Sequence, residues 1–137
     1  MLVGRRSWKI EWGDCDPAGI VHFPRYLFFF DSCTVSLFEQ AGLPKRQMLR
    51  DYNMAGCPVV DLRVRFLIPS QYGDEVVIES AIREWRRSSF EVQHRLLRGE
   101  ALAVEGIETR VWTVRDPVDT ERLKGAPIPE DVRARFA

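Results

Sequence analysis

Asp14 and Asp16 flank a cysteine near the N-terminus, and their types and spacing suit acyl transfer. Pro17 and Gly19 force a turn directly after them. Pro24 lies where a helix would begin, because proline lacks the N–H that a first helical turn leaves unpaired. A carboxylate that faces free backbone N–H groups combines a nucleophile or base with donors for an oxyanion. These residues therefore predict attack on the carbonyl of an ester or thioester.

The hydrophobic pattern around this segment predicts one long helix and an antiparallel sheet. Apolar residues recur at helical spacing over Pro24–Ala41, and Gly42 is expected to end that helix. A strand is expected before it, over Arg5–Glu11, and a shorter helix after it, over Lys45–Tyr52. Alternating apolar and polar residues then predict four half-buried strands, over Val60–Ile68, Val76–Trp85, Phe90–Leu97 and Leu102–Val114. This order indicates an α+β fold in which a curved antiparallel sheet wraps the helix.

Length and composition limit the class of protein. A chain of 137 residues fits one domain, 1–137, that is small for an enclosed pocket, so a site shared between subunits is expected. The 20 basic and 20 acidic residues cancel, which gives no reason to expect nucleic-acid or membrane binding. The three cysteines lack the spacing of a zinc site or disulfide framework, and no apolar run is long enough to span a bilayer. A cytoplasmic protein without a metal is expected.

The acidic segment resembles the signature of the 4-hydroxybenzoyl-CoA thioesterase family of hot-dog-fold enzymes. That signature, Gly-Asp-Cys-Asp-Pro-Ala-Gly-Ile-Val before a long central helix, occurs here at 13–21. A second stretch, Glu-Trp-Arg-Arg-Ser-Ser-Phe at 84–90, is similar to the family's Glu-Trp-Arg-Arg-Lys-Ser-Phe. The resemblance covers about residues 5–115 and implies a hot-dog fold. It also implies a homodimer formed by two sheets edge to edge, with active sites at the interface, and a possible homotetramer of two dimers.

Asp16 is the residue that we expect to carry catalysis. From the residues alone, its carboxylate either caps the turn at Pro17 or takes part in the chemistry. The resemblance implies the second, because the matching aspartate of the family is the essential carboxylate, as a nucleophile or as a general base on water. Asp14 is expected to be structural and to bond the loop backbone. At the helix start, where unpaired N–H groups meet the positive end of the dipole, the resemblance implies that the Phe23 N–H polarises the thioester carbonyl.

Two further residues leave alternatives open. His22 can be a general acid, a donor to the acyl group, or a partly buried packing residue. Asp31 lies two turns into the expected helix, after an apolar run, where a carboxylate requires a partner. That partner is either a backbone group or arginine of the sheet, or else the polar end of a bound acyl group.

Arg86 and Arg87 follow an expected strand and should emerge at a sheet edge. Guanidinium groups there can bind phosphates in a bidentate manner, although an ordinary solvated turn explains the pair equally well. The resemblance implies that this stretch contacts the phosphates of the CoA nucleotide. Ser88 stands where the family has a lysine, which removes one cation and weakens the expected binding of the nucleotide.

Together these features predict an acyl-CoA thioesterase that hydrolyses an aryl, hydroxybenzoyl-type thioester. No cofactor is expected, since CoA is part of the substrate. An aliphatic acyl-CoA thioesterase would use the same chemistry. A hot-dog hydratase or dehydratase would pair Asp16 with His22, but the spacing of the two residues argues against it. A non-catalytic acyl-CoA-binding protein on the same fold is the remaining alternative.

Overall fold

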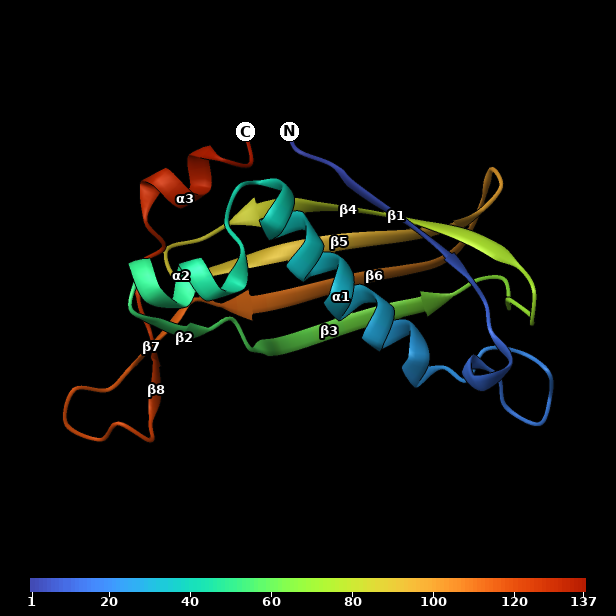
Figure 1. The fold of residues 1–137 in the computed structure, drawn as a ribbon, viewed down its shortest axis with the longest axis horizontal. Coiled ribbons are helices and arrows are strands. Elements are labelled where there is room, and N and C mark those ends of the chain that lie inside the picture. Colours follow the sequence, from blue (N-terminus) through green and yellow to red (C-terminus); the bar gives the residue numbers. More distant parts are fainter.

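The computed structural model describes residues 1–137, in which a long helix lies along one face of an antiparallel sheet (Figure 1). Strand β1 (Gly4–Lys9) leads into an acidic loop, residues 10–23, which contains the short 3-10 helix η1 (Trp12–Asp14). Helix α1 (Pro24–Gln40) follows, and α2 (Lys45–Asp51) lies beyond its C-terminal end. The remaining elements are β2 (Met54–Gly56), β3 (Val59–Phe66), β4 (Glu75–Trp85), β5 (Ser89–Arg98), β6 (Ala101–Val111), β7 (Thr113–Arg115), β8 (Leu123–Gly125) and α3 (Glu130–Ala134).

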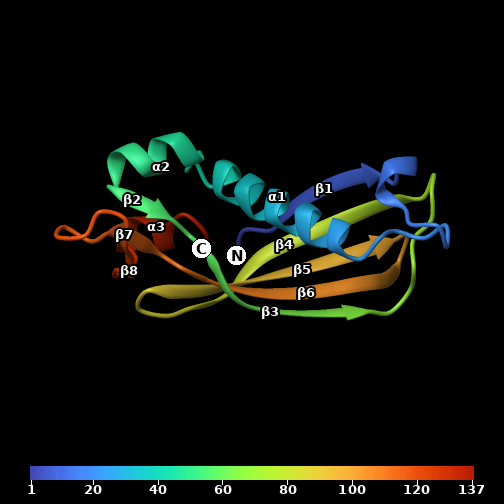
Figure 2. The ribbon, with the colours of Figure 1, turned by 90° about the horizontal axis from the view of Figure 1, so that it is seen from below.

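The large sheet has the strand order β1-β4-β5-β6-β3, and every neighbouring pair is antiparallel. Figure 2 shows that this sheet curves beneath α1. A second sheet of three short strands, in the order β2-β7-β8, lies at the α2 end of the molecule. The expected α+β hot-dog fold, a curved antiparallel sheet around a central helix, is confirmed.

Helix α1 begins and ends where its residues require. Pro24 is its first residue, and Gly42, with a φ of +81°, follows the C-terminal cap at Ala41. The helix therefore ends one residue earlier than expected, at Gln40. None of the helices has both the length and the apolar character that a membrane crossing requires.

A row of buried polar residues divides the core between helix and sheet into two apolar clusters. The cluster nearer the acidic loop includes Phe29, Phe30, Ile78, Leu96 and Val104. The cluster nearer α2 and α3 includes Leu37, Phe38, Ile82, Val92, Trp112 and Val132. Between them lie five buried polar residues, which we call the polar belt: Thr34 on α1, Ser80 on β4, His94 on β5, and Glu108 and Arg110 on β6.

The strands differ from the expected ones in two places, at Trp112 and in the second sheet. The strand expected over Leu102–Val114 is interrupted at Trp112, whose indole is buried in the α2-side cluster. Beyond Trp112 the backbone leaves the large sheet, since Thr113 and Val114 pair with β2 and β8 of the second sheet. The second sheet was not expected, because its strands have three residues each, too few for an alternating pattern to show.

The alternating pattern of strand β3 predicted that it is half-buried, and this prediction is wrong. Val60, Leu62 and Phe66 are 61%, 38% and 51% exposed, and the charged residues between them are exposed as well. The reason is the position of β3, which is an edge strand with a neighbour only on the β6 side. An apolar edge strand is therefore left uncovered in the single chain.

Candidate active site

Asp14 is buried and ties the acidic loop together, which confirms its structural interpretation. One carboxylate oxygen accepts the Glu11 N–H at 2.9 Å, and its backbone carbonyl accepts the His22 N–H at 2.8 Å. The other carboxylate oxygen accepts from Arg25 on the first turn of α1, with Nε at 3.1 Å and Nη2 at 3.0 Å. A single side chain thus joins both ends of the loop to the helix start.

Asp16 combines a turn role with a free carboxylate oxygen. Its Oδ1 accepts the Ala18 N–H at 2.9 Å, and its own N–H donates to the Ile20 carbonyl at 2.9 Å. The chain therefore folds back on itself, so that Cys15 pairs with Val21. Oδ2 has no hydrogen-bond partner in the protein, and the side chain is half-buried. The turn-capping interpretation is correct for one oxygen and leaves the other available for chemistry.

The Phe23 N–H is unpaired at the start of α1. The next N–H groups are taken, since that of Arg25 donates to the His22 carbonyl at 2.9 Å and that of Tyr26 to the Phe23 carbonyl at 3.2 Å. Pro24 contributes no N–H. The Phe23 amide is therefore a free donor at the positive end of the helix dipole.

His22 is exposed, so its interpretation as a partly buried packing residue is wrong. Its ring contacts the Phe23 ring edge-on, with centroids 5.6 Å apart. Phe23 in turn is 59% exposed and lies against Phe66 of β3, with ring centroids 6.3 Å apart. The helix start and the uncovered edge strand therefore form one continuous, partly aromatic surface.

Asp31 bonds an arginine of the sheet, which was one of its two expected partners. Arg110 Nη2 donates to Asp31 Oδ1 at 2.7 Å, while the Asp31 side chain remains 66% exposed. Arg110 itself is buried and has a second carboxylate partner, Glu108, at 3.0 Å. Asp31 is thus the solvent-facing end of the polar belt.

The rest of the polar belt was missed by sequence reasoning. His94 is fully buried between Ser80 Oγ, 2.7 Å from its Nδ1, and Glu108 Oε1, 2.9 Å from its Nε2. Thr34 donates to the same Glu108 oxygen, and Phe30 stacks on the imidazole with centroids 4.8 Å apart. For two of them a signal was available, because Ser80 and His94 each lie two residues from buried apolar neighbours on an otherwise apolar strand face.

Glu108 is the buried anion of the belt. Burial opposes its charged form, but the hydrogen bonds and charges of His94 and Arg110 outweigh burial and lower the pKa of Glu108 below its ordinary value. Glu108 is therefore a carboxylate that compensates the buried guanidinium of Arg110.

The three residues expected to contact the CoA phosphates differ in whether the structure leaves them free to do so. Arg86 Nη2 already donates to Glu84 at 2.9 Å and to Glu91 at 3.0 Å, so it is not the free cation that was expected. Arg87 is exposed, and its guanidinium makes no ion pair. Ser88 is half-buried and holds Trp112 through its carbonyl. Only Arg87 of the three presents an uncompensated charge.

No group of three or more His, Cys, Asp or Glu side chains lies close enough together to hold a metal ion. The chemistry that the site itself offers is that of a carboxylate and a free backbone donor in the same loop.

Comparison with known proteins gives consistent matches over nearly the whole chain. A model of the thioesterase-like superfamily matches residues 10–136. The 4-hydroxybenzoyl-CoA thioesterase of Pseudomonas sp. (strain CBS-3) is 38% identical over 129 residues, which cover 90% of this chain and 89% of that protein. A 1,4-dihydroxy-2-naphthoyl-CoA hydrolase of Synechococcus sp. (strain WH7803) is 26% identical over 143 residues, covering 96% of this chain and 90% of that protein.

Solved structures agree. An aspartate-to-asparagine mutant of 4-hydroxybenzoyl-CoA thioesterase complexed with 4-hydroxybenzoyl-CoA is similar with a TM-score of 0.91 and 33% identity, over 98% of this chain and 99% of that chain. A gentisyl-coenzyme A thioesterase is similar with a TM-score of 0.82 and 29% identity, over 95% and 99% of the two chains.

The sheet wrapped around a central helix, with the acidic loop at the helix start, defines the class of hot-dog thioesterases. The chain belongs to the thioesterase-like superfamily, as the match over residues 10–136 and the 38% identical relative show. The family resemblance seen in the sequence is confirmed, and with it the prediction that this protein is an enzyme that hydrolyses thioesters.

Proposed function

We propose that this enzyme hydrolyses an aryl-CoA thioester to the free acid and CoA. The observation that carries the proposal is that one loop, directly before α1, holds both a free carboxylate oxygen, Asp16 Oδ2, and an unpaired backbone N–H, that of Phe23. The substrate class rests on relatives whose names specify hydroxybenzoyl, dihydroxynaphthoyl and gentisyl thioesters, all of them aromatic.

In this reaction Asp16 attacks the thioester carbonyl or removes a proton from an attacking water. Either route moves the carbonyl electrons onto oxygen, where the Phe23 N–H stabilises the developing charge; one such donor contributes about 3 kcal/mol to the transition state. The C–S bond then breaks, and the CoA thiolate leaves and takes up a proton. In the nucleophilic route, water afterwards hydrolyses the mixed anhydride on Asp16.

The CoA nucleotide is proposed to bind near Arg87. Its guanidinium has no carboxylate partner, whereas Arg86 would have to leave Glu84 and Glu91 to reach a phosphate. Ser88 can supply a hydroxyl where the family has a charge. Replacing Arg87 with Gln should therefore raise the KM for acyl-CoA more than the same change at Arg86, and neither should alter the KM for a pantetheine thioester.

A homodimer is proposed to complete the site, and two dimers to form a tetramer. The support is the uncovered apolar edge of β3, which is continuous with Phe23 through its contact with Phe66. Pairing two β3 edges would satisfy free backbone groups and bury this surface. His22 and Asp31 are exposed and available to a substrate that lies between two subunits.

The experiment that tests the function is thiol release from a panel of acyl-CoAs, with Asp16→Asn as the blank. Benzoyl-CoA and 4-hydroxybenzoyl-CoA should be hydrolysed fast, and short and long aliphatic thioesters slowly. A preference for aliphatic chains would support thioester hydrolysis but show that the substrate is an aliphatic acyl-CoA. Absence of turnover on every thioester would contradict the proposal and leave a hydratase or an acyl-CoA-binding protein.

A further inference from the structure

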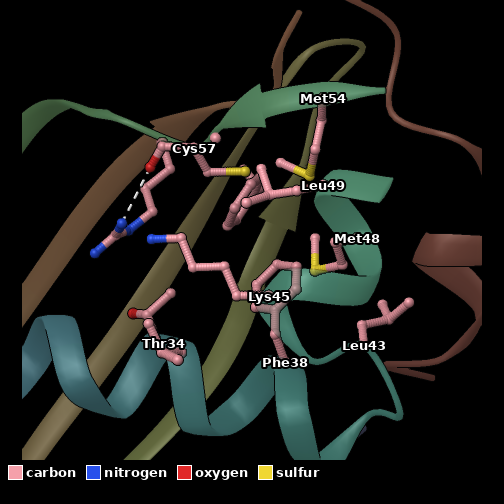
Figure 3. A pocket seen from close by; sticks show the side chains of 12 residues that line it. Thr34, Phe38, Leu43, Lys45, Met48, Leu49, Met54 and Cys57 are labelled. Carbon is pink, nitrogen blue, oxygen red and sulfur yellow. Dashed lines mark hydrogen bonds between the residues drawn. The ribbon is translucent and has the colours of Figure 1, made fainter. Parts of the chain in front are cut away.

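A second candidate site, a pocket with an apolar wall and a charged end, lies away from the acidic loop, beside the C-terminal half of α1. A pocket with an empty volume of about 520 Å³, including its open mouth, is bounded by α1, α2, β2 and the underlying sheet. Figure 3 shows its sulfur-bearing and aromatic wall, formed by Phe38, Met48, Met54 and Cys57. Most of its lining residues are hydrophobic. An apolar body is thus the part of a ligand that this wall would accept.

One end of the pocket is cationic. Arg110 lines the pocket, and its side chain is 10% exposed. Its Nη1 donates to the Cys57 carbonyl at 3.0 Å, and its Nη2 binds Asp31 and Glu108. Its Nε, by contrast, is buried without any hydrogen-bond partner. Because that nitrogen is closed to solvent, Arg110 contributes its charge to this end of the pocket rather than a free hydrogen-bond donor.

Lys45 brings a second cation to the same end. In Figure 3 its side chain reaches over the pocket, with the amine directed toward the guanidinium that donates to Cys57. Lys45 makes no ion pair, whereas the charge of Arg110 is shared with two carboxylates. Burial raises the pKa of the Cys57 thiol to about 12 against the opposing charges of Arg110 and Lys45, so both cations lie near that thiol.

We propose that this pocket binds a small organic monocarboxylate with an apolar body. The carboxylate pairs with Lys45 at the guanidinium end of the pocket, and the body packs among Phe38, Met48 and Met54. Free phosphate does not fit, because it would leave the apolar wall empty. Asp31 and Glu108 already compensate the charge of Arg110, so Lys45, which has no carboxylate partner, supplies the attraction for an anion. The inference does not depend on the proposed function, although a thioesterase releases acids of this class.

Methionine methyl NMR tests the site directly. The chain has three methionines, of which Met48 and Met54 line the pocket and Met1 is 79% exposed at the terminus. In [13C-methyl]methionine protein, benzoate should shift the Met48 and Met54 signals saturably and leave Met1 unchanged. Assignment follows from Met48→Leu and Met54→Leu. Benzamide, which has the same shape without the charge, should bind at least about tenfold more weakly.

A matched pair of lysine variants provides the control. Lys45→Gln should weaken benzoate binding about tenfold, and Lys124→Gln, on the exposed strand β8, should not change it. Equal binding of benzoate and benzamide, or an unchanged affinity in Lys45→Gln, would overturn the proposal. So would shifts produced by a thioether analogue of benzoyl-CoA and not by benzoate, since the pocket would then hold the acyl arm of the substrate. All of these readouts are binding measurements, so they remain informative if no thioester is hydrolysed.

Discussion

The acidic loop and the polar belt are both built from charged residues, but they are assembled in opposite ways. In the loop, Asp14 and Asp16 bond groups no more than eleven residues away, and the free groups face solvent. In the belt, Thr34 and Glu108 are 74 residues apart in sequence, and Asp31 and Arg110 are 79 apart. Every carboxylate and ring nitrogen of the belt has a partner.

This difference indicates a division of labour. A reacting carboxylate must keep an unpaired oxygen, and the loop leaves Asp16 Oδ2 free at the cost of exposure. A buried charge must be paired, because an uncompensated ion in the core is strongly destabilising. Loss of Asp16 should therefore reduce activity with little effect on folding, and loss of a belt residue should do the reverse.

Asp16→Asn should produce the largest effect and separates the two regions most sharply. Asparagine keeps the Oδ1 acceptor for the Ala18 N–H, so the turn should persist. The nucleophilic or basic oxygen is lost, and kcat should fall roughly a thousandfold or more. Thiol release gives the rate, and thermal unfolding should show an unchanged midpoint. Retention of most of the rate would contradict the assignment of Asp16.

Glu108→Gln should destabilise the fold by about 3 kcal/mol, because it leaves Arg110 buried with a single, exposed carboxylate partner. Urea unfolding at fixed protein concentration measures this, since an oligomer's stability depends on concentration. Glu105→Gln is the matched control: Glu105 lies on the other face of β6 and makes no ion pair. Equal stability of the two variants would show that the belt contributes nothing beyond packing.

Phe23→Pro should reduce kcat roughly a hundredfold by removing the free N–H at the helix start. The native φ of −53° is compatible with proline, so the backbone need not move. Phe23→Ala keeps the N–H and should retain most of the rate. Circular dichroism confirms that the helix is intact in both variants. If Phe23→Ala were as slow as Phe23→Pro, the side chain rather than the amide would be responsible.

Asp14→Asn tests whether a residue of the acidic loop also stabilises the fold. It weakens the charged bonds to Arg25 and should cost about 1.5 kcal/mol of stability, with a smaller loss of kcat than Asp16→Asn. Asp61→Asn is the comparison, because Asp61 pairs with Arg63 at 3.8 Å, both side chains are more than 60% exposed, and the pair should contribute almost nothing. Chemical unfolding compares the two, and an equal loss would contradict the clamp role of Asp14.

Acid should affect the belt through Glu108. Because the pKa of Glu108 is lower in the folded protein than in the unfolded chain, its contribution to stability is complete above the unfolded value, about 4.5, and is lost as the pH falls through the folded value. The stability difference between wild type and Glu108→Gln should therefore shrink below about pH 4.5. Urea midpoints from pH 7 to pH 3 measure it. A difference that stays constant over this range would mean that Glu108 does not titrate with unfolding.

Residues close together in sequence were the predictable part of this protein. The helix over Pro24–Gln40, the long strands, the turn at Asp16 and the structural role of Asp14 all follow from local patterns. The short strands of the second sheet did not, because three residues carry no period. Burial of β3 was wrongly inferred, since alternation shows which side chains share a face but not whether anything covers it.

The amino-acid sequence by itself determined the acidic loop with its helix start, because backbone turns and caps depend on neighbouring residues. The family and the hot-dog fold came from the resemblance of the 13–21 and 84–90 motifs to a known family. Only the tertiary structure decided that Arg110 binds Asp31, that Glu91 occupies Arg86, and that His94 is enclosed beneath α1. These pairs join different strands and helices. Their partners are chosen by strand register and by the packing of the helix on the sheet, which no local pattern contains.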